Sequence, residues 1–292
     1  MFKTLSLSTI ALLSASAATA QGVEYLSYGA GYTNLSDGDT SANIYALYGA
    51  VDYRVNNAFI SGGLGYTRLS DSFDDFGITN ITARGGYFVA PQAVIYGGIN
   101  YFDADDVDSF TSYDIGAEYS FASATVGLNY DDSNEAGYES TVTVYASYRM
   151  NETLEAGLFY SDNDFGSTTS LGMDYDDGTF DVAAVLSDFE GETIFGIDAS
   201  YAFGNDFRAS GGYVDLDGFI DILSVGAGYE VSSDMWVDLE FGRASDGVDD
   251  IDVISLALTY ELGRETLLID RAQSTQTDAL GVFGGLIAAS GF

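Results

Sequence analysis

Apolar and polar residues alternate in short segments along most of this chain, from Gln21 to about Gly263. The alternation is clearest between residues 110 and 149. In the segment 122–131, Ala124, Val126 and Leu128 are separated by small or polar residues. Successive side chains of a β-strand point to opposite faces, so a period of two indicates strands with one apolar and one polar face.

The alternation predicts about sixteen strands, bounded by turn-forming residues. They cover residues 24–35, 42–54, 57–69, 78–89, 93–102, 110–121, 122–131, 139–149, 154–161, 167–175, 179–187, 192–203, 207–215, 219–231, 234–243 and 251–262.

Nearly every predicted strand carries an aromatic residue at one end of its apolar face. The odd-numbered strands have Tyr32, Tyr66, Tyr101, Tyr130, Tyr160, Phe189, Tyr213 and Phe241, and the even-numbered strands have Tyr53, Tyr87, Tyr119, Tyr148, Tyr175, Tyr201, Tyr229 and Tyr260. Aromatic rings at both ends of an apolar face are typical of a bilayer, because they settle at the headgroup level. The sequence therefore predicts an all-β fold, an antiparallel transmembrane β-barrel over residues 21–263.

The connections between the predicted strands alternate in kind. Short turns lie at 55–56, 90–92, 151–153, 176–178, 204–206 and 232–233, and mostly longer, acidic loops lie at 36–41, 70–77, 103–109, 132–138, 162–166 and 244–250. Outer-membrane barrels have short periplasmic turns and longer outer loops, so we expect both ends of this barrel to face the periplasm.

The first twenty residues have the pattern of a cleaved secretory signal. Lys3 precedes the apolar run Leu5 to Leu13, and Ala18-Thr19-Ala20 forms a cleavage site before Gln21. No later stretch has the roughly 18 uninterrupted apolar residues of a membrane-spanning helix.

Composition limits the chemistry that this chain can perform. It has no cysteine and no histidine, so the usual general base is missing and we expect no enzyme activity and no cofactor. The formal net charge of −36 repels nucleic acid and attracts cations. An aromatic content of 14% argues against disorder despite this charge.

With this architecture, residues 21–263 resemble the bacterial outer-membrane porins, most closely the sixteen-stranded general porins. The resemblance implies a passive channel for small hydrophilic solutes in the outer membrane, surrounded by lipid and lipopolysaccharide, in a family that forms homotrimers. Two features depart from the family. The third acidic loop, 103–109, is too short to fold into the barrel as a constriction, and a tail of unassigned placement, 264–292, follows the last predicted strand.

Strand parity identifies candidate pore-lining residues. The side chains predicted to point inward near mid-depth include Arg84, Asp114, Glu118, Asp198, Asp238 and Glu240. Carboxylates around a water-filled lumen favour cations over anions, so we expect cation preference. The alternatives are a solvated polar wall without a role in transport and, for Arg84, an ion pair across the lumen instead of a narrowing of the pore.

Other charged residues have weaker assignments. Arg68 and Arg243 are predicted to point outward near the outer rim, where they could meet lipid phosphates. The acidic segments 103–108 and 215–218 match no calcium-binding loop pattern, so solvated loops are favoured over divalent cation sites and no metal site is predicted.

The tail leaves two functions open. Thr266 to Ile269 and Leu280 to Ala289 are apolar enough to need a partner, so the tail either plugs the lumen, packs in the periplasm or adds a strand pair. The main hypothesis is a cation-preferring diffusion channel. The alternative is a structural or surface-interaction barrel with a plugged lumen.

Overall fold

The computed structural model describes residues 22–38, 40–70, 75–105, 107–133, 140–163, 166–204, 206–263 and 265–280. The signal segment expected at 1–20 lies outside these residues. So do parts of the expected loops 70–77, 103–109 and 132–138, and the apolar stretch of the tail beyond Leu280.

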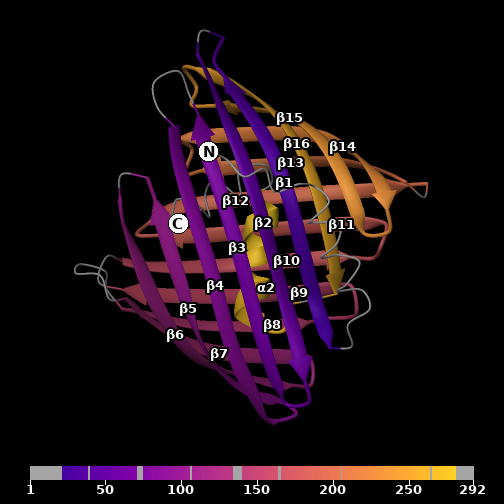
Figure 1. The fold of residues 1–292 in the computed structure, drawn as a ribbon. Coiled ribbons are helices and arrows are strands. Elements are labelled where there is room, and N and C mark those ends of the chain that lie inside the picture. Colours follow the sequence, from indigo (N-terminus) through magenta and orange to yellow (C-terminus); the bar gives the residue numbers. More distant parts are fainter. Residues whose placement is uncertain are drawn as a thin grey trace, which may run out of the picture.

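Sixteen strands form one closed barrel in which each strand pairs antiparallel with its neighbour in the chain (Figure 1). The ring closes where β1 pairs with β16, with Tyr28 opposite Tyr260. The strands are β1 (Val23–Ser36), β2 (Ser41–Val55), β3 (Ala58–Ser70), β4 (Asp75–Ala90), β5 (Ala93–Ala104), β6 (Val107–Phe121), β7 (Ala124–Ser133), β8 (Thr141–Arg149), β9 (Leu154–Asn163), β10 (Gly166–Asp176), β11 (Phe180–Phe189), β12 (Glu192–Phe203), β13 (Phe207–Leu216), β14 (Ile220–Ser232), β15 (Met235–Ser245) and β16 (Asp250–Gly263). The predicted all-β antiparallel barrel is confirmed.

The strands are longer than predicted at the end of the barrel that carries the acidic loops. β5 extends to Ala104 and β6 already begins at Val107, so most of the loop expected at 103–109 is strand. Ladder hydrogen bonds continue past the apolar band into residues whose acidic side chains reach water, where alternation no longer marks a strand. We call this end the loop end. The other end, where β1 begins and β16 ends, is the turn end.

The outer face of the barrel is apolar and uncovered. Ile60, Ile115 and Leu223 are 66%, 65% and 62% exposed. So large an apolar surface is stable only against lipid. Aromatic rings lie along its margin, for example Phe207, whose ring centroid is 5.1 Å from that of Tyr229. A closed barrel with this surface has the structure of an integral outer-membrane protein.

Glycines on the inner face make room for large side chains that lie along the wall. A Cβ on Gly127 would fall into the ring of Tyr145, and one on Gly116 would fall into the ring of Tyr96. Glycine is needed at such positions because another part of the molecule approaches the backbone closely. The lumen wall is therefore partly aromatic, although parity predicts a polar one.

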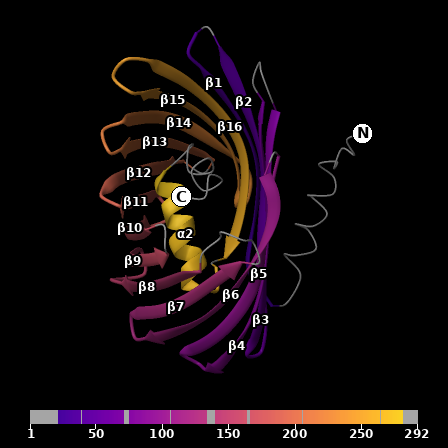
Figure 2. The same cartoon turned by 90° about the vertical axis from the view of Figure 1, so that its left-hand side faces the viewer.

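One helix, α2 (Leu268–Ala279), lies inside the barrel (Figure 2). Its neighbours are β7, β8 and β10 to β12. Within the part of the chain that the structure describes, no helix is long and apolar enough to cross a bilayer.

Candidate functional site: the lumen and its helix

The start of α2 is held in an apolar pocket of the inner wall. Leu267, Leu268 and Ile269 are buried, and they form one cluster with Phe59, Val94, Tyr96 and Tyr145 of β3, β5 and β8. Burying these side chains contributes roughly 1.5–3 kcal/mol each, which stabilises this end of α2 in the lumen.

Glu118 of β6 caps the helix from the barrel wall. Its Oε1 atom accepts hydrogen bonds from the backbone N–H groups of Leu268 at 2.8 Å and Ile269 at 3.2 Å. Leu267, at the N-cap position, supplies no side-chain cap. The Tyr145 hydroxyl donates to the same Glu118 oxygen at 2.9 Å. Glu118 thus takes the place of a capping residue and offers a negative charge to the positive end of the helix dipole.

Arg84 of β4 joins the wall to the first turn of α2. Its Nε atom donates to Asp114 Oδ2 at 3.0 Å, and its Nη1 atom pairs with Asp270 of the helix. Beside this pair, the Thr266 N–H donates to Asp52 Oδ2 at 2.6 Å. Arg84 therefore takes part in ion pairs that tie the helix to the wall.

The other end of α2 packs against the middle of β11 and β12. Ala279 and Leu280 are buried in a second apolar cluster with Ala183, Val185, Val214, Ile222 and Ala244. A Cβ on Gly196 would lie 2.6 Å from the Ala279 carbonyl oxygen, so the helix end touches the backbone of β12. Because Glu118 lies near the turn end of β6 and Gly196 near the middle of β12, α2 extends from the turn end to about mid-depth of the lumen.

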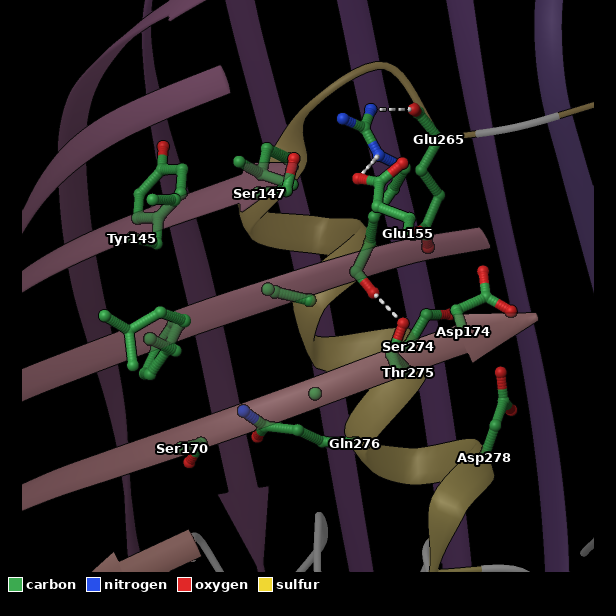
Figure 3. Close-up of a pocket in the computed structure, with 18 of the residues that line it drawn as sticks. Tyr145, Ser147, Glu155, Ser170, Asp174, Glu265, Ser274, Thr275, Gln276 and Asp278 are labelled. Atoms are coloured by element: carbon green, nitrogen blue, oxygen red, sulfur yellow. Dashed lines mark hydrogen bonds and ion pairs between the residues drawn. The ribbon is translucent and has the colours of Figure 1, made fainter. Parts of the chain in front are cut away.

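One side of α2 packs against β8 to β10 and leaves little free space. The gap is a cavity of about 130 Å³ between wall residues such as Ser147 and Ser170 and the helix residues Ser274 to Asp278 (Figure 3). Arg271 faces Glu155 across it, 4.0 Å away, and donates to the Glu265 carbonyl oxygen at 3.0 Å.

Other parts of the lumen are lined by exposed polar side chains. Tyr48 of β2 points inward from the wall and is 44% exposed, and the inward carboxylates Asp181 and Glu261 are exposed as well. Asp278 of α2 is also exposed. Among the residues that the structure describes, no ion pair reaches Asp181, Asp198, Glu240, Glu261 or Asp278. Asp181, Glu261 and Asp278 are therefore exposed carboxylates without an ion pair in the described part of the chain, whereas Asp198 and Glu240 are half-buried.

The charges of the tail influence one another strongly. Enclosure by the barrel, and then the nearby Asp270 and Asp52, raise the pKa of Glu265 to about 8. Enclosure, followed by Glu261 and Asp181, raises the pKa of Asp278 to about 7. The ionised form of both carboxyl groups is therefore less stable inside the lumen than in water.

The six predicted pore-lining residues divide into three groups. Arg84, Asp114 and Glu118 hold the start of α2. Asp238 is neutralised by Arg208, whose Nε and Nη2 atoms donate to its two oxygens at 2.7 and 2.6 Å. Asp198 and Glu240 carry no ion pair among the described residues.

Asp270 and Asp278 are not among the predicted site residues, because strand parity does not apply to the tail. An apolar cluster followed by a polar segment at 267–280 is the sequence feature that indicates a docked helix.

The acidic segments at the loop end serve local structure. Asp215 Oδ1 accepts the Gly218 N–H at 2.8 Å and shapes the turn before β14. Across the described ranges, no group of three or more acidic side chains is placed to hold a metal ion.

Several solved structures have the same architecture. OccAB4 of Acinetobacter baumannii superposes with a TM-score of 0.54 at 10% identity, covering 83% of this chain and 99% of that one. OpdQ of Pseudomonas aeruginosa gives 0.53 at 10% identity, with 83% and 99% covered. A mutant of the Rh. blastica porin gives 0.50 at 12% identity, with 82% and 100% covered.

The chain has the fold of the outer-membrane porins. No protein-family model and no curated protein sequence matches it. At such low identity the likeness extends to the barrel fold alone.

Proposed function

We propose that this protein is a passive, cation-preferring diffusion channel of the bacterial outer membrane, narrowed by its own helix α2. The observation that carries the proposal is the set of inward carboxylates without an ion pair among the described residues, of which Asp181, Glu261 and Asp278 are exposed. In an enclosed lumen such groups attract cations and repel anions, because low-dielectric walls focus their field.

In general porins a loop folded into the barrel forms the constriction, and in this proposal α2 forms it instead. All the described connections at the loop end are short, whereas α2 lies inside the lumen and is fixed at both ends. A helix with its side chains is roughly 10–12 Å across, so it removes a large part of the cross-section of a barrel of this size.

The same helix favours a second candidate, a structural barrel whose lumen is closed. At the loop end the inward side chains Val214, Ile222 and Val253 are each less than 5% exposed, so that part of the lumen is filled. A barrel without residues 265–292 separates the two candidates. If the full-length protein conducts, the channel stands, whereas conductance that appears only after the deletion supports the closed barrel.

The test of cation preference uses planar bilayers with a KCl gradient. We expect the triple variant Asp198→Asn, Glu240→Gln, Asp278→Asn to move the reversal potential towards zero. A matched triple at the loop end, Asp103→Asn, Asp105→Asn, Asp108→Asn, should move it less, because bulk salt screens charges beyond about 8 Å. A larger effect of the loop triple would place the selectivity at the mouth instead of along α2.

A further inference from the structure

The position of α2 determines which part of the lumen solutes can use. The helix lies against β8 and β10 to β12, where Tyr145 and Ser170 are 1% and 2% exposed. On the wall formed by β1, β2, β15 and β16, Tyr25, Ile44 and Val253 are buried, but Tyr48, which lies between them in depth, is 44% exposed. Water-filled space therefore borders this wall at the depth of Tyr48.

Tyr48 lies flat on that wall. Its cross-strand neighbours on the inner face are Gly29 of β1 and Gly65 of β3. A Cβ on Gly29 would collide with Cζ, Oη and Cε1 of Tyr48, so the ring extends over β1 towards β16. A ring that lies along the wall presents its π face, which carries partial negative charge, to the lumen.

The charges around the ring are mostly negative. The groups that act on the Tyr48 hydroxyl are Asp278 of α2, Glu261 of β16, Asp238 of β15 and Arg208 of β13. Arg208 is paired with Asp238, and its guanidinium lies 4.5 Å from the ring centre of Trp236. Glu261 and Asp278 have no such partner among the described residues. A cation passing the ring therefore meets two carboxyl groups that have no cationic partner among the described residues.

We propose that Tyr48 is a specificity-determining residue of this channel, and that its ring, with Glu261 and Asp278, favours the passage of small organic ammonium ions. The inference rests on the proposed channel function and names the solute class of the same path. An aromatic face attracts a weakly hydrated, alkylated ammonium group, because little hydration is lost when the two meet. Carboxylates alone attract K⁺ and an ammonium ion alike, so the ring supplies the discrimination between them.

The test measures the permeability of tetramethylammonium relative to K⁺ from bi-ionic reversal potentials in planar bilayers. We expect Tyr48→Leu to lower this ratio by about two- to fivefold, the range of a partly exposed cation–π contact. Tyr48→Phe keeps the aromatic face and should keep the ratio. Tyr45→Leu, on the outer face of the same strand, is the matched control and should also leave it unchanged.

The preference for K⁺ over chloride serves as the second readout. It should be the same in Tyr48→Leu as in the wild type, because the substitution removes no charge. A tetramethylammonium ratio that Tyr48→Leu leaves unchanged overturns the inference, and so does a wild-type channel that conducts K⁺ but no tetramethylammonium. A wild-type preference for chloride overturns the proposed function itself.

Discussion

Replacing Glu118 by leucine is the most informative perturbation of the lumen. The substitution keeps a side chain of similar size in a buried site but removes the oxygen that accepts the Leu268 and Ile269 N–H groups. Both residues are buried, so water cannot replace the lost acceptor. Each unsatisfied buried donor costs about 1–3 kcal/mol.

Two effects reduce this loss. The Tyr145 hydroxyl keeps a partner, because it also lies 2.9 Å from the Tyr96 hydroxyl. The leucine variant also no longer has to remove a carboxylate from water when α2 docks, which is itself costly. We therefore expect the docking of α2 to weaken by about 2–4 kcal/mol, which corresponds to a change on the order of a hundredfold in the docking equilibrium.

Hydrogen–deuterium exchange of the segment 265–280 in detergent micelles measures this change. Exchange in Glu118→Leu should be faster by roughly the factor given by the lost free energy, while the amides of the barrel strands keep their protection. Glu118→Gln keeps one carbonyl oxygen and should have a smaller effect. Ser120→Ala, on the same strand and face, is the control. Wild-type exchange in Glu118→Leu would show that this carboxylate does not hold the helix.

Three further predictions concern the wall, the packing and the pH dependence. Leu128→Asp places a charge in the lipid-facing band and should impair membrane assembly at a cost of about 2–4 kcal/mol. Thr125→Asp, on the inner face of the same strand, should assemble. Equal behaviour of the two variants in a heat-modifiability assay would refute the assigned faces. Gly127→Val should lower the thermal stability of the barrel in detergent, because the valine side chain would collide with the ring of Tyr145. An unchanged melting temperature would contradict this packing. Docking raises the pKa of Glu265 to about 8 and of Asp278 to about 7, so these groups take up protons as the pH falls from 9 to 6 and α2 docks more firmly. Hydrogen–deuterium exchange of the α2 amides, corrected for its intrinsic pH dependence, should therefore slow over this range. Faster exchange at lower pH would contradict the argument.

The wall of the barrel could be predicted from the sequence because strand periodicity is local. Parity alone places Leu128 on the apolar face and Glu118 and Asp198 inward, and the register shows that Leu128 and Ala117 lie side by side on one face. The strand ends were predicted less well, since beyond the lipid the alternation no longer has to be apolar against polar.

The contents of the lumen could not be predicted in this way. Glu118 and Leu268 are separated by 150 positions in the chain, and nothing in the alternation of β6 distinguishes a carboxylate that caps a helix from one that faces water. The acids Asp198 and Glu118 look alike in sequence, yet the structure leaves the first unpaired and uses the second to hold α2. Only the placement of the tail separates the two roles.

The reversal potential of the wild-type protein in a KCl gradient tests the central claim most directly. A single barrel inserted into a planar bilayer should conduct, with a reversal potential whose sign shows that K⁺ passes more readily than chloride. A reversal potential of the opposite sign, or a barrel that stays silent with and without residues 265–292, would contradict the proposal of a cation-preferring channel.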